Sequence, residues 1–215
     1  DWNDIVLSPV KQIKAYVDAI YNNIVRYRDE SDLKTFEKLV DLCQQYGLHN
    51  EKAIMFRNIA KYNYYRDDNK KAIEVYMEAI QATDARYVDA LVILNTELAE
   101  HYHIERNVIE VEKHLEVAAK LISEHYVSNA ALYKYYFRRG IILRRDGKSP
   151  EARHHFEKAE RYAEVNNESI SEKGAVYLAI GATYKREENY EQAKSYYFKA
   201  LFYFHENDIY GRSAV

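Results

Sequence analysis

The chain has 215 residues, of which 47% are hydrophobic and 30% charged, and its formal net charge is −3 at pH 7. This balance argues against a dedicated nucleic-acid-binding domain, which normally carries a basic excess. No run of 18 apolar residues is present, which argues against a membrane-spanning helix. One cysteine excludes a disulfide framework, and we expect a cytoplasmic protein.

The first predicted elements are two helices. Ser8-Pro9 opens a helix over about 10–27, and residues 1–9 are interpreted as the end of a linker. Ser31 is predicted to cap a second helix that runs to about Tyr46, before the stop at Gly47. Cys43 lies on the apolar face of this helix, where we expect a core side chain rather than a reactive thiol.

From residue 60 onward, a spacing pattern recurs four times. A small residue is followed twelve positions later by a small or apolar one, four later by an aromatic or Leu, and three later by Ala. The four sets are 60-72-76-79, 99-111-115-118, 140-152-156-159 and 181-193-197-200. The first positions lie 39, 41 and 41 residues apart, and a fixed period of this length indicates stacked supersecondary units.

The pattern describes a pair of helices. A small first residue, such as Gly140 or Gly181, lets the two helices approach closely, and the second small residue is expected to meet it across the pair. Turns are predicted at 67–69, 146–150 and 187–189, with Ser149 as the cap and Pro150 as the first helical residue of the helix that follows. With 2 Pro, 6 Gly and no alternating strand pattern, the sequence predicts ten helices in five pairs and an all-α fold.

The repeat resembles the tetratricopeptide repeat. The last unit matches best, with Tyr177, Ile180, Gly181, Tyr184, Ala193, Tyr197 and Ala200. The match weakens toward the N-terminus, where Asn63 stands at the usual Tyr position, and the closing Pro of each repeat is absent. The resemblance implies a right-handed solenoid of about five helix pairs over residues 10–206, with 207–215 as a C-terminal tail.

In a tetratricopeptide repeat the first helix of each pair lines a concave groove that holds a peptide. The resemblance therefore predicts a peptide-binding site, with no catalytic residue, metal or cofactor. Its residues are Tyr21, Asn22, Arg57, Asn58, Lys61, Tyr64, Thr96, Glu100, His103, Phe137, Arg138, Ile141 and Leu178.

The residue types in this set suit an extended peptide. Asn carries a donor and an acceptor and can pair with a peptide backbone regardless of its sequence. Arg57, Lys61 or Arg138 is expected to bind a carboxylate, and Phe137, Ile141 and Leu178 to form apolar pockets. Two Glu-x-x-His motifs, at Glu100 and Glu151, are not interpreted as metal ligands, because Glu151 lies in the first turn of a helix, where a carboxylate complements the helix dipole, and His154 lies on a face predicted to be solvated.

Five pairs with a period of about 40 and helices rich in Tyr and Asn resemble the C-terminal domain of the Rgg/Rap/PlcR class of quorum-sensing receptors of Gram-positive bacteria. The resemblance implies a short peptide ligand, dimerisation through the repeats, and DNA binding only through a helix-turn-helix domain outside this chain.

Two alternatives remain at this stage. One is a general protein–protein interaction scaffold. The other is a co-chaperone-like module, because Lys134 and Arg138 match part of a carboxylate clamp, whereas Glu97 and Lys61 replace the Asn residues expected there.

The last predicted helix, about 190–206, is expected to mediate homodimerisation. It carries Tyr196, Phe198, Phe202, Tyr203 and Phe204, more aromatic surface than one preceding helix covers. A repeat array leaves one apolar face at its end unless that face is capped or paired. The sequence therefore predicts that this end packs on a symmetric copy.

Overall fold

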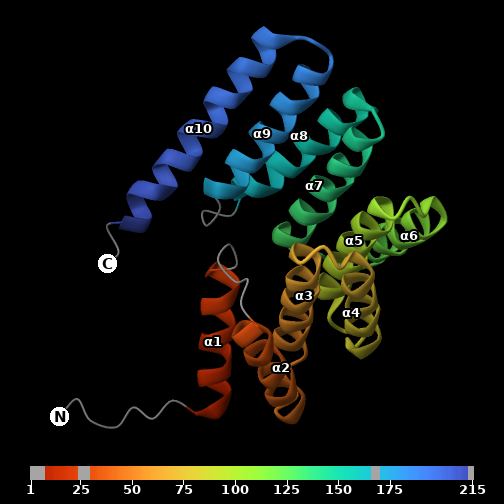
Figure 1. Cartoon of the computed structure of the whole chain (residues 1–215), viewed down its shortest axis with the longest axis vertical. Helices are drawn as coiled ribbons and strands as arrows, with labels where there is room; N and C mark the ends of the chain where they lie inside the picture. The colour runs from red at the N-terminus through yellow and green to blue at the C-terminus, as the bar shows by residue number, and fades with distance from the viewer. Residues whose placement is uncertain (1–7, 24–29, 166–169, 213–215) are drawn as a thin grey trace. The chain divides into compact units, whose positions relative to one another are not determined.

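The computed structural model describes residues 8–23, 30–165 and 170–212; the side chains of 18–23, 164, 165, 170, 171 and 205–212 lie outside this description. These residues form ten α-helices in chain order (Figure 1). Their bounds are α1 Pro9–Asn23, α2 Glu30–Gln45, α3 His49–Tyr65, α4 Asn69–Ala82, α5 Val88–Ile104, α6 Val108–Glu124, α7 Asn129–Arg145, α8 Ser149–Val165, α9 Ile170–Arg186 and α10 Tyr190–Arg212. The predicted all-α fold with consecutive helix pairs is confirmed.

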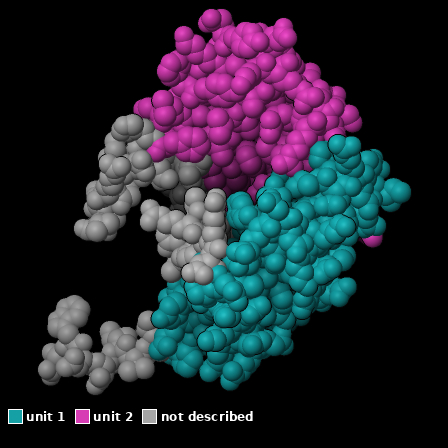
Figure 2. All heavy atoms as spheres, viewed as in Figure 1, with its two compact units in different colours: residues 1–112 teal, residues 113–215 magenta. Residues whose placement is uncertain are grey.

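The chain divides into two compact units, residues 1–112 and 113–215 (Figure 2). In unit 1, α3 packs on α4 and on α2, and α5 packs on both α3 and α4. In unit 2, α7 packs on α8, α9 packs on α7 and α8, and α10 packs on α9. Within each unit, the first helix of one pair therefore lies against both helices of the pair before it.

Close helix crossings occur at the glycines of the repeat pattern. A Cβ on Gly140 would lie 2.5 Å from Cε1 of Phe156, and a Cβ on Gly181 would lie 2.6 Å from Cε1 of Tyr197. The predicted close approach is confirmed. The nearest partner of the small residue is the aromatic ring sixteen positions later, and at Gly181 the carbonyl oxygen of the second small residue, Ala193, lies 3.2 Å from the Cβ position.

The turn within each of the last four pairs has the same backbone geometry. The residue seven positions after the small residue has a positive φ: 61° at Asp67, 58° at Arg106, 82° at Gly147 and 59° at Glu188. The next amide donates back to the helix, as in Asp68 N to Asn63 O at 3.0 Å and Lys148 N to Leu143 O at 2.9 Å. These bonds satisfy helix-end carbonyls in the manner of a Schellman motif.

Several predicted helix ends differ from the structure. Ser31 lies inside the first turn of α2, where its carbonyl accepts a hydrogen bond from the Thr35 hydroxyl. α8 begins at Ser149, one residue earlier than predicted, because the amide of Ala152 donates to the carbonyl of Lys148. α10 continues to Arg212, beyond the predicted end at Glu206, and the expected end of the first helix at Tyr27 lies outside the described residues.

Each unit has its own hydrophobic core. The core of unit 1 includes Val17, Cys43, Met55, Tyr76 and Leu98, and that of unit 2 includes Phe156, Ala159 and Val176. Cys43 is fully buried, as predicted, and its burial, aided by Glu51, raises the thiol pKa to about 11. A thiol with such a pKa is a core side chain and not a nucleophile at neutral pH.

Candidate functional site: the first-helix face of unit 1

A buried ion pair joins α3 and α5 at predicted groove positions. Arg57 donates from Nε to Oε2 of Glu97 at 2.5 Å and from Nη2 to Oε1 at 2.6 Å. The two residues are 6% and 2% exposed. This two-bond geometry matches the guanidinium fork to the carboxylate, so the pair fixes the position of α5 on α3.

Two further groups converge on Glu97. The Tyr76 hydroxyl donates to Oε2 at 3.2 Å, and Nζ of Lys61 lies 3.8 Å from Oε1. Arg57 and Lys61, both predicted to bind a ligand carboxylate, thus already face a carboxylate of the protein. A ligand carboxylate would have to compete with Glu97 for either cation.

A small pocket opens beside this ion pair. It has a volume of about 240 Å³ and lies between α3 and α5. Its walls are mostly apolar, and polar groups stand at its edges; the lining residues are Asn50, Ala53, Ile54, Arg57, Asp89, Ala90, Ile93 and Leu94. Apolar walls with a few polar groups are typical of binding sites for small ligands or single side chains.

Asn58, on α3, is a buried polar residue whose side chain has no hydrogen-bond partner. It is 4% exposed, and neither Nδ2 nor Oδ1 has a hydrogen-bond partner in the structure. It lies one turn after Ile54 on α3, so the two side chains share one stripe of the helix. A buried carboxamide without partners costs about 1–3 kcal/mol, which is a reason to look for a ligand that supplies them.

The other predicted residues of unit 1 fall into three groups. Thr96 is fully buried and its hydroxyl donates to the Val92 carbonyl at 2.6 Å, so it does not line the surface as predicted. Glu100 is buried, while Tyr64 and His103 are half-buried. Tyr21 and Asn22 lie in α1, but their side chains are outside the described residues.

A polar cluster that was not predicted from the sequence joins the start of α4 to the end of α5. Asn69 donates from Nδ2 to Glu105 Oε1 at 2.7 Å and to the His101 carbonyl at 3.1 Å, and its Oδ1 lies 2.7 Å from Nδ1 of His101. The rings of Tyr64 and Tyr76 each lie 5.0 Å from the His101 ring. His101 lies between the two ends of the Glu100–His103 motif, and no spacing signal in the sequence marks it.

Four predicted residues belong to unit 2. Phe137 and Ile141 are half-buried and pack against its core, with the Phe137 ring 5.7 Å from that of Phe156. Arg138 is half-buried, and Leu178 is 49% exposed. Thus Phe137 and Ile141 contribute to packing within the unit.

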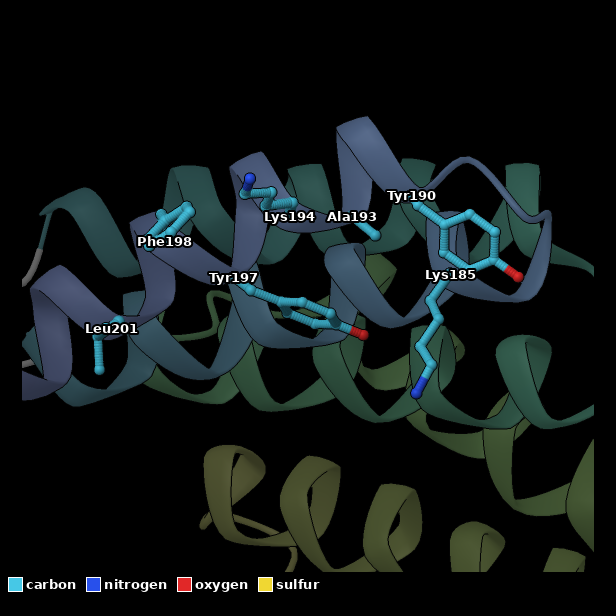
Figure 3. Close-up of a pocket in the computed structure, with 7 residues that line it drawn as sticks. All are labelled: Lys185, Tyr190, Ala193, Lys194, Tyr197, Phe198 and Leu201. Carbon is cyan, nitrogen blue, oxygen red and sulfur yellow. The ribbon is translucent and has the colours of Figure 1, made fainter.

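The end of unit 2 carries an open apolar surface. A pocket of about 360 Å³ lies along α10, with Lys185 contributed by α9 (Figure 3). Its other lining residues are Tyr190, Ala193, Lys194, Tyr197, Phe198 and Leu201. Phe198, Leu201 and the neighbouring Phe202 are each more than half exposed.

The preceding repeat shows how the corresponding surface is covered. Forty-one residues earlier, the counterparts of Lys194, Phe198 and Leu201 are Arg153, Glu157 and Glu160. There, Arg153 donates to Glu187, the residue that follows α9, at 2.7 Å, and Glu160 accepts a hydrogen bond from the Tyr177 hydroxyl of α9. On α10 the two carboxylates at these positions, Glu157 and Glu160, are replaced by the apolar Phe198 and Leu201, whereas Arg153 is replaced by another basic residue, Lys194.

Within the part of the chain that the structure describes, no group of three or more His, Cys, Asp and Glu residues is arranged to hold a metal ion. Over the same residues, no helix is both long and apolar enough to cross a membrane.

Comparison with known proteins identifies the fold. No protein-family model matches the chain, and no curated protein matches it. Among solved structures, Bacillus thuringiensis PlcR in complex with the peptide PapR7 and DNA has a TM-score of 0.69 at 14% identity, over 98% of this chain and 75% of PlcR. BtubC (BKLC) from P. vanneervenii has a TM-score of 0.59 at 15% identity, over 94% of this chain and 93% of BtubC. A Podosopora anserina putative kinesin light chain with TPR-like repeats has a TM-score of 0.50 at 12% identity, over 93% and 98% of the two chains. At these identities the likeness concerns the fold, and the chain is a tetratricopeptide-like helical-repeat domain.

Proposed function

We propose that this chain is the peptide-binding repeat domain of a bacterial peptide-responsive regulator, and that the first-helix face of unit 1 binds the peptide. The observation that carries the proposal is the buried, unpartnered carboxamide of Asn58, which follows the pocket-lining Arg57 on α3 and lies one turn after the pocket-lining Ile54. The likeness to PlcR, whose structure contains a bound peptide, supports it at the level of fold.

We expect the ligand to be a short, extended peptide of mostly apolar residues. One apolar side chain fits the pocket lined by Ile54, Ile93 and Leu94. The Asn58 carboxamide supplies a donor and an acceptor, which match one peptide group of the ligand. Because both atoms are inaccessible in the free protein, binding requires a neighbouring side chain to move aside.

Lys61 is the better-placed cation of unit 1 for a ligand carboxylate. Its side chain is 18% exposed and lies 3.8 Å from Glu97, whereas Arg57 is held by two short bonds.

The test combines affinity with stability. A library of synthetic heptapeptides built from Ala, Val, Ile, Leu, Phe and Tyr, with free C-termini, is screened against the chain, and the best binder is titrated by calorimetry. Asn58→Leu should weaken binding at least fivefold, yet raise the free energy of unfolding of the free protein by about 1 kcal/mol, because it removes an unsatisfied buried amide. A carboxamide with a purely structural role would give lower stability and unchanged affinity.

Two variants complete this test. Asn95→Leu is the matched control for stability: the Asn95 carboxamide donates to the Leu91 carbonyl at 2.8 Å, so its removal should not stabilise the protein. Lys61→Ala should weaken binding more than tenfold if Lys61 holds the carboxylate in a desolvated pair. If no peptide of the library binds, the alternative of a general protein-interaction scaffold, including a co-chaperone-like module, gains support.

We also propose that the exposed apolar surface of α10, around Phe198 and Leu201, packs on a second copy of the chain. The support is the replacement of Glu157 and Glu160 by Phe198 and Leu201 at the corresponding positions of α10. An exposed apolar surface of this kind is typical of a protein–protein contact.

A further inference from the structure

We propose that a second groove in unit 1 binds a segment of a partner protein in which an aromatic side chain stands next to basic residues. The groove has a volume of about 360 Å³ and lies between α2, α3 and α4. Its apolar surface comes from Phe56, Ile59 and Val75, and carboxylates stand at its edge on Glu37, Asp41 and Glu78.

This groove is separate from the proposed peptide site. Phe56, Ile59 and Asn63 line the groove, whereas Ile54 and Arg57 line the pocket between α3 and α5. At 100° per residue, the two sets lie on opposite sides of α3. A ligand in the groove therefore leaves the proposed peptide site free, and this inference does not depend on the function proposed above.

The same repeat positions in unit 2 show what normally fills this space. The counterparts 121 residues later of Phe56, Asn63 and Val75 are Tyr177, Tyr184 and Tyr196. The rings of Tyr184 and Tyr196 stack with centroids 5.5 Å apart, and those of Tyr177 and Tyr196 are 6.2 Å apart. In unit 2, three aromatic rings thus occupy the corresponding positions.

In unit 1 the middle of this aromatic stack is missing. Val75 has no ring, and Asn63 is turned back on its own helix, donating from Nδ2 to the Ile59 carbonyl at 2.8 Å. The remaining space of about 360 Å³ is ample for an aromatic ring, since an apolar cavity of about 150 Å³ already accepts benzene. The groove therefore lacks a ring that its counterpart contains.

The charge beside the stack is reversed between the two units. In unit 2, Nζ of Lys199 lies 4.9 Å from the centroid of the Tyr196 ring and 5.6 Å from that of Tyr177. The counterpart of Lys199 in unit 1 is Glu78. Among the described residues, Glu37, Asp41 and Glu78 form no ion pair, and the basic lining residue Lys71 is paired with Glu74 at 2.9 Å.

These two differences define the chemistry of the occupant. The ring that unit 1 lacks has to come from the ligand, and so does the cation that would accompany it. A Tyr, Phe or Trp side chain fills the apolar space, and a neighbouring Lys or Arg meets Glu78, Asp41 or Glu37. Cation–π contact between the ligand's own basic and aromatic groups would reproduce the arrangement of Lys199 over Tyr196.

The experiment titrates the full 215-residue chain with the capped pentapeptide acetyl-Gly-Lys-Tyr-Lys-Gly-amide, followed by backbone NMR. Saturable shifts are expected at α2, α3 and α4 residues of the groove. The versions with Ala in place of Tyr, or with Glu in place of both Lys, should bind at least tenfold more weakly. Equal affinity for the acidic version, or shifts confined to α10, overturns the proposal.

Two substitutions convert the groove toward its counterpart in unit 2. Val75→Tyr supplies the missing ring and Glu78→Lys supplies the cation, and each substitution should lower the affinity for the Lys-Tyr-Lys peptide at least fivefold. Glu157→Lys, an exposed site on α8, is the matched control for charge and should leave affinity unchanged. Unchanged affinity in both groove variants contradicts the proposal; if Val75→Tyr does not fold, the exposed Glu78→Lys decides alone.

A last variant separates this inference from the function proposed above. Asn58→Leu alters the opposite side of α3 and should leave binding of the Lys-Tyr-Lys peptide unchanged. Loss of both ligands in Asn58→Leu would mean that the two sites are not distinct, and would overturn the assignment of this groove.

Discussion

The imidazole of His155 stacks on the ring of Tyr136, with centroids 5.9 Å apart, and its Nδ1 is buried without a hydrogen-bond partner. Burial, together with the nearby charges of Arg139, Lys158 and His154, lowers the pKa of His155 to about 4. The neutral imidazole is therefore the form that the fold accepts.

This arrangement makes stability depend on pH. Because the pKa in the folded state lies below the unfolded value of about 6.5, the unfolded chain takes up the proton first as the pH falls. The stabilising contribution is complete above pH 6.5 and is lost between about pH 6.5 and 4. Relative to His155→Phe, which retains a ring against Tyr136, the wild type should lose about 1 kcal/mol or more over this range, measured by urea unfolding. The exposed His154→Phe serves as the control, and a constant difference between wild type and His155→Phe across the range contradicts the prediction.

The Arg57–Glu97 pair should be a major determinant of the packing of α5 on α3. Removal of one partner leaves a buried charge uncompensated, so Glu97→Ala should lower the free energy of unfolding by about 3–5 kcal/mol. The matched control is Lys14→Ala, because the Lys14–Glu51 pair has a half-exposed lysine and a surface pair is worth less than about 1 kcal/mol. Urea unfolding measures both variants. Similar decreases in the free energy of unfolding would show that the buried Arg57–Glu97 pair contributes no more than a surface pair.

Gly181 is expected to tolerate no larger residue. Gly181→Leu should cost about 1–3 kcal/mol, because its Cβ would lie 2.6 Å from the Tyr197 ring and force the α9–α10 pair apart. Thermal unfolding gives the measurement, with the exposed substitution Glu191→Leu as control. A melting temperature equal to that of the wild type would mean that the crossing is not as close as described.

In the turns within the helix pairs, substitution by glycine should stabilise the fold. Asp67, Arg106 and Glu188 hold positive φ angles at the position that Gly147 occupies in the third full repeat. Glu188→Gly should therefore stabilise the fold by about 0.5–1 kcal/mol, and Gly147→Ala should destabilise it by about 1 kcal/mol. Urea unfolding of the two variants decides; a loss of stability in Glu188→Gly would show that its side chain compensates the strained backbone.

The exposed apolar surface of α10, formed by Phe198, Leu201 and Phe202, should mediate self-association. Sedimentation at tens of micromolar should give a dimer for the wild type and a monomer for Leu201→Glu, since a charge would be buried in the apolar contact. Glu191→Gln, an exposed change outside the pocket on the same helix, should remain dimeric. A monomeric wild type contradicts the proposed second copy.

The sequence alone was sufficient for the helices and for their pairing, because both follow from local periodicity. The 12-4-3 spacing placed Gly140 and Gly181 at crossings, and the structure has them there against Phe156 and Tyr197. Helix ends were less accurate, as at Ser31 and Ser149, because capping depends on one or two hydrogen bonds that spacing does not reveal.

The candidate site required the tertiary structure. A repeat pattern states which side of a helix a residue occupies but not which residue of another helix it meets. Arg57 and Glu97 are 40 positions apart and satisfy each other, Thr96 is turned into the core, and Asn58 is buried with no partner. The groove beside Val75 is likewise invisible in sequence, since Asn63 was recognised as a departure from the Tyr position but the space it leaves depends on how α2, α3 and α4 pack. Local spacing determined the repeat; the contacts between helices, which depend on side-chain volume and charge at the crossing, decided which of its positions remain open to a ligand.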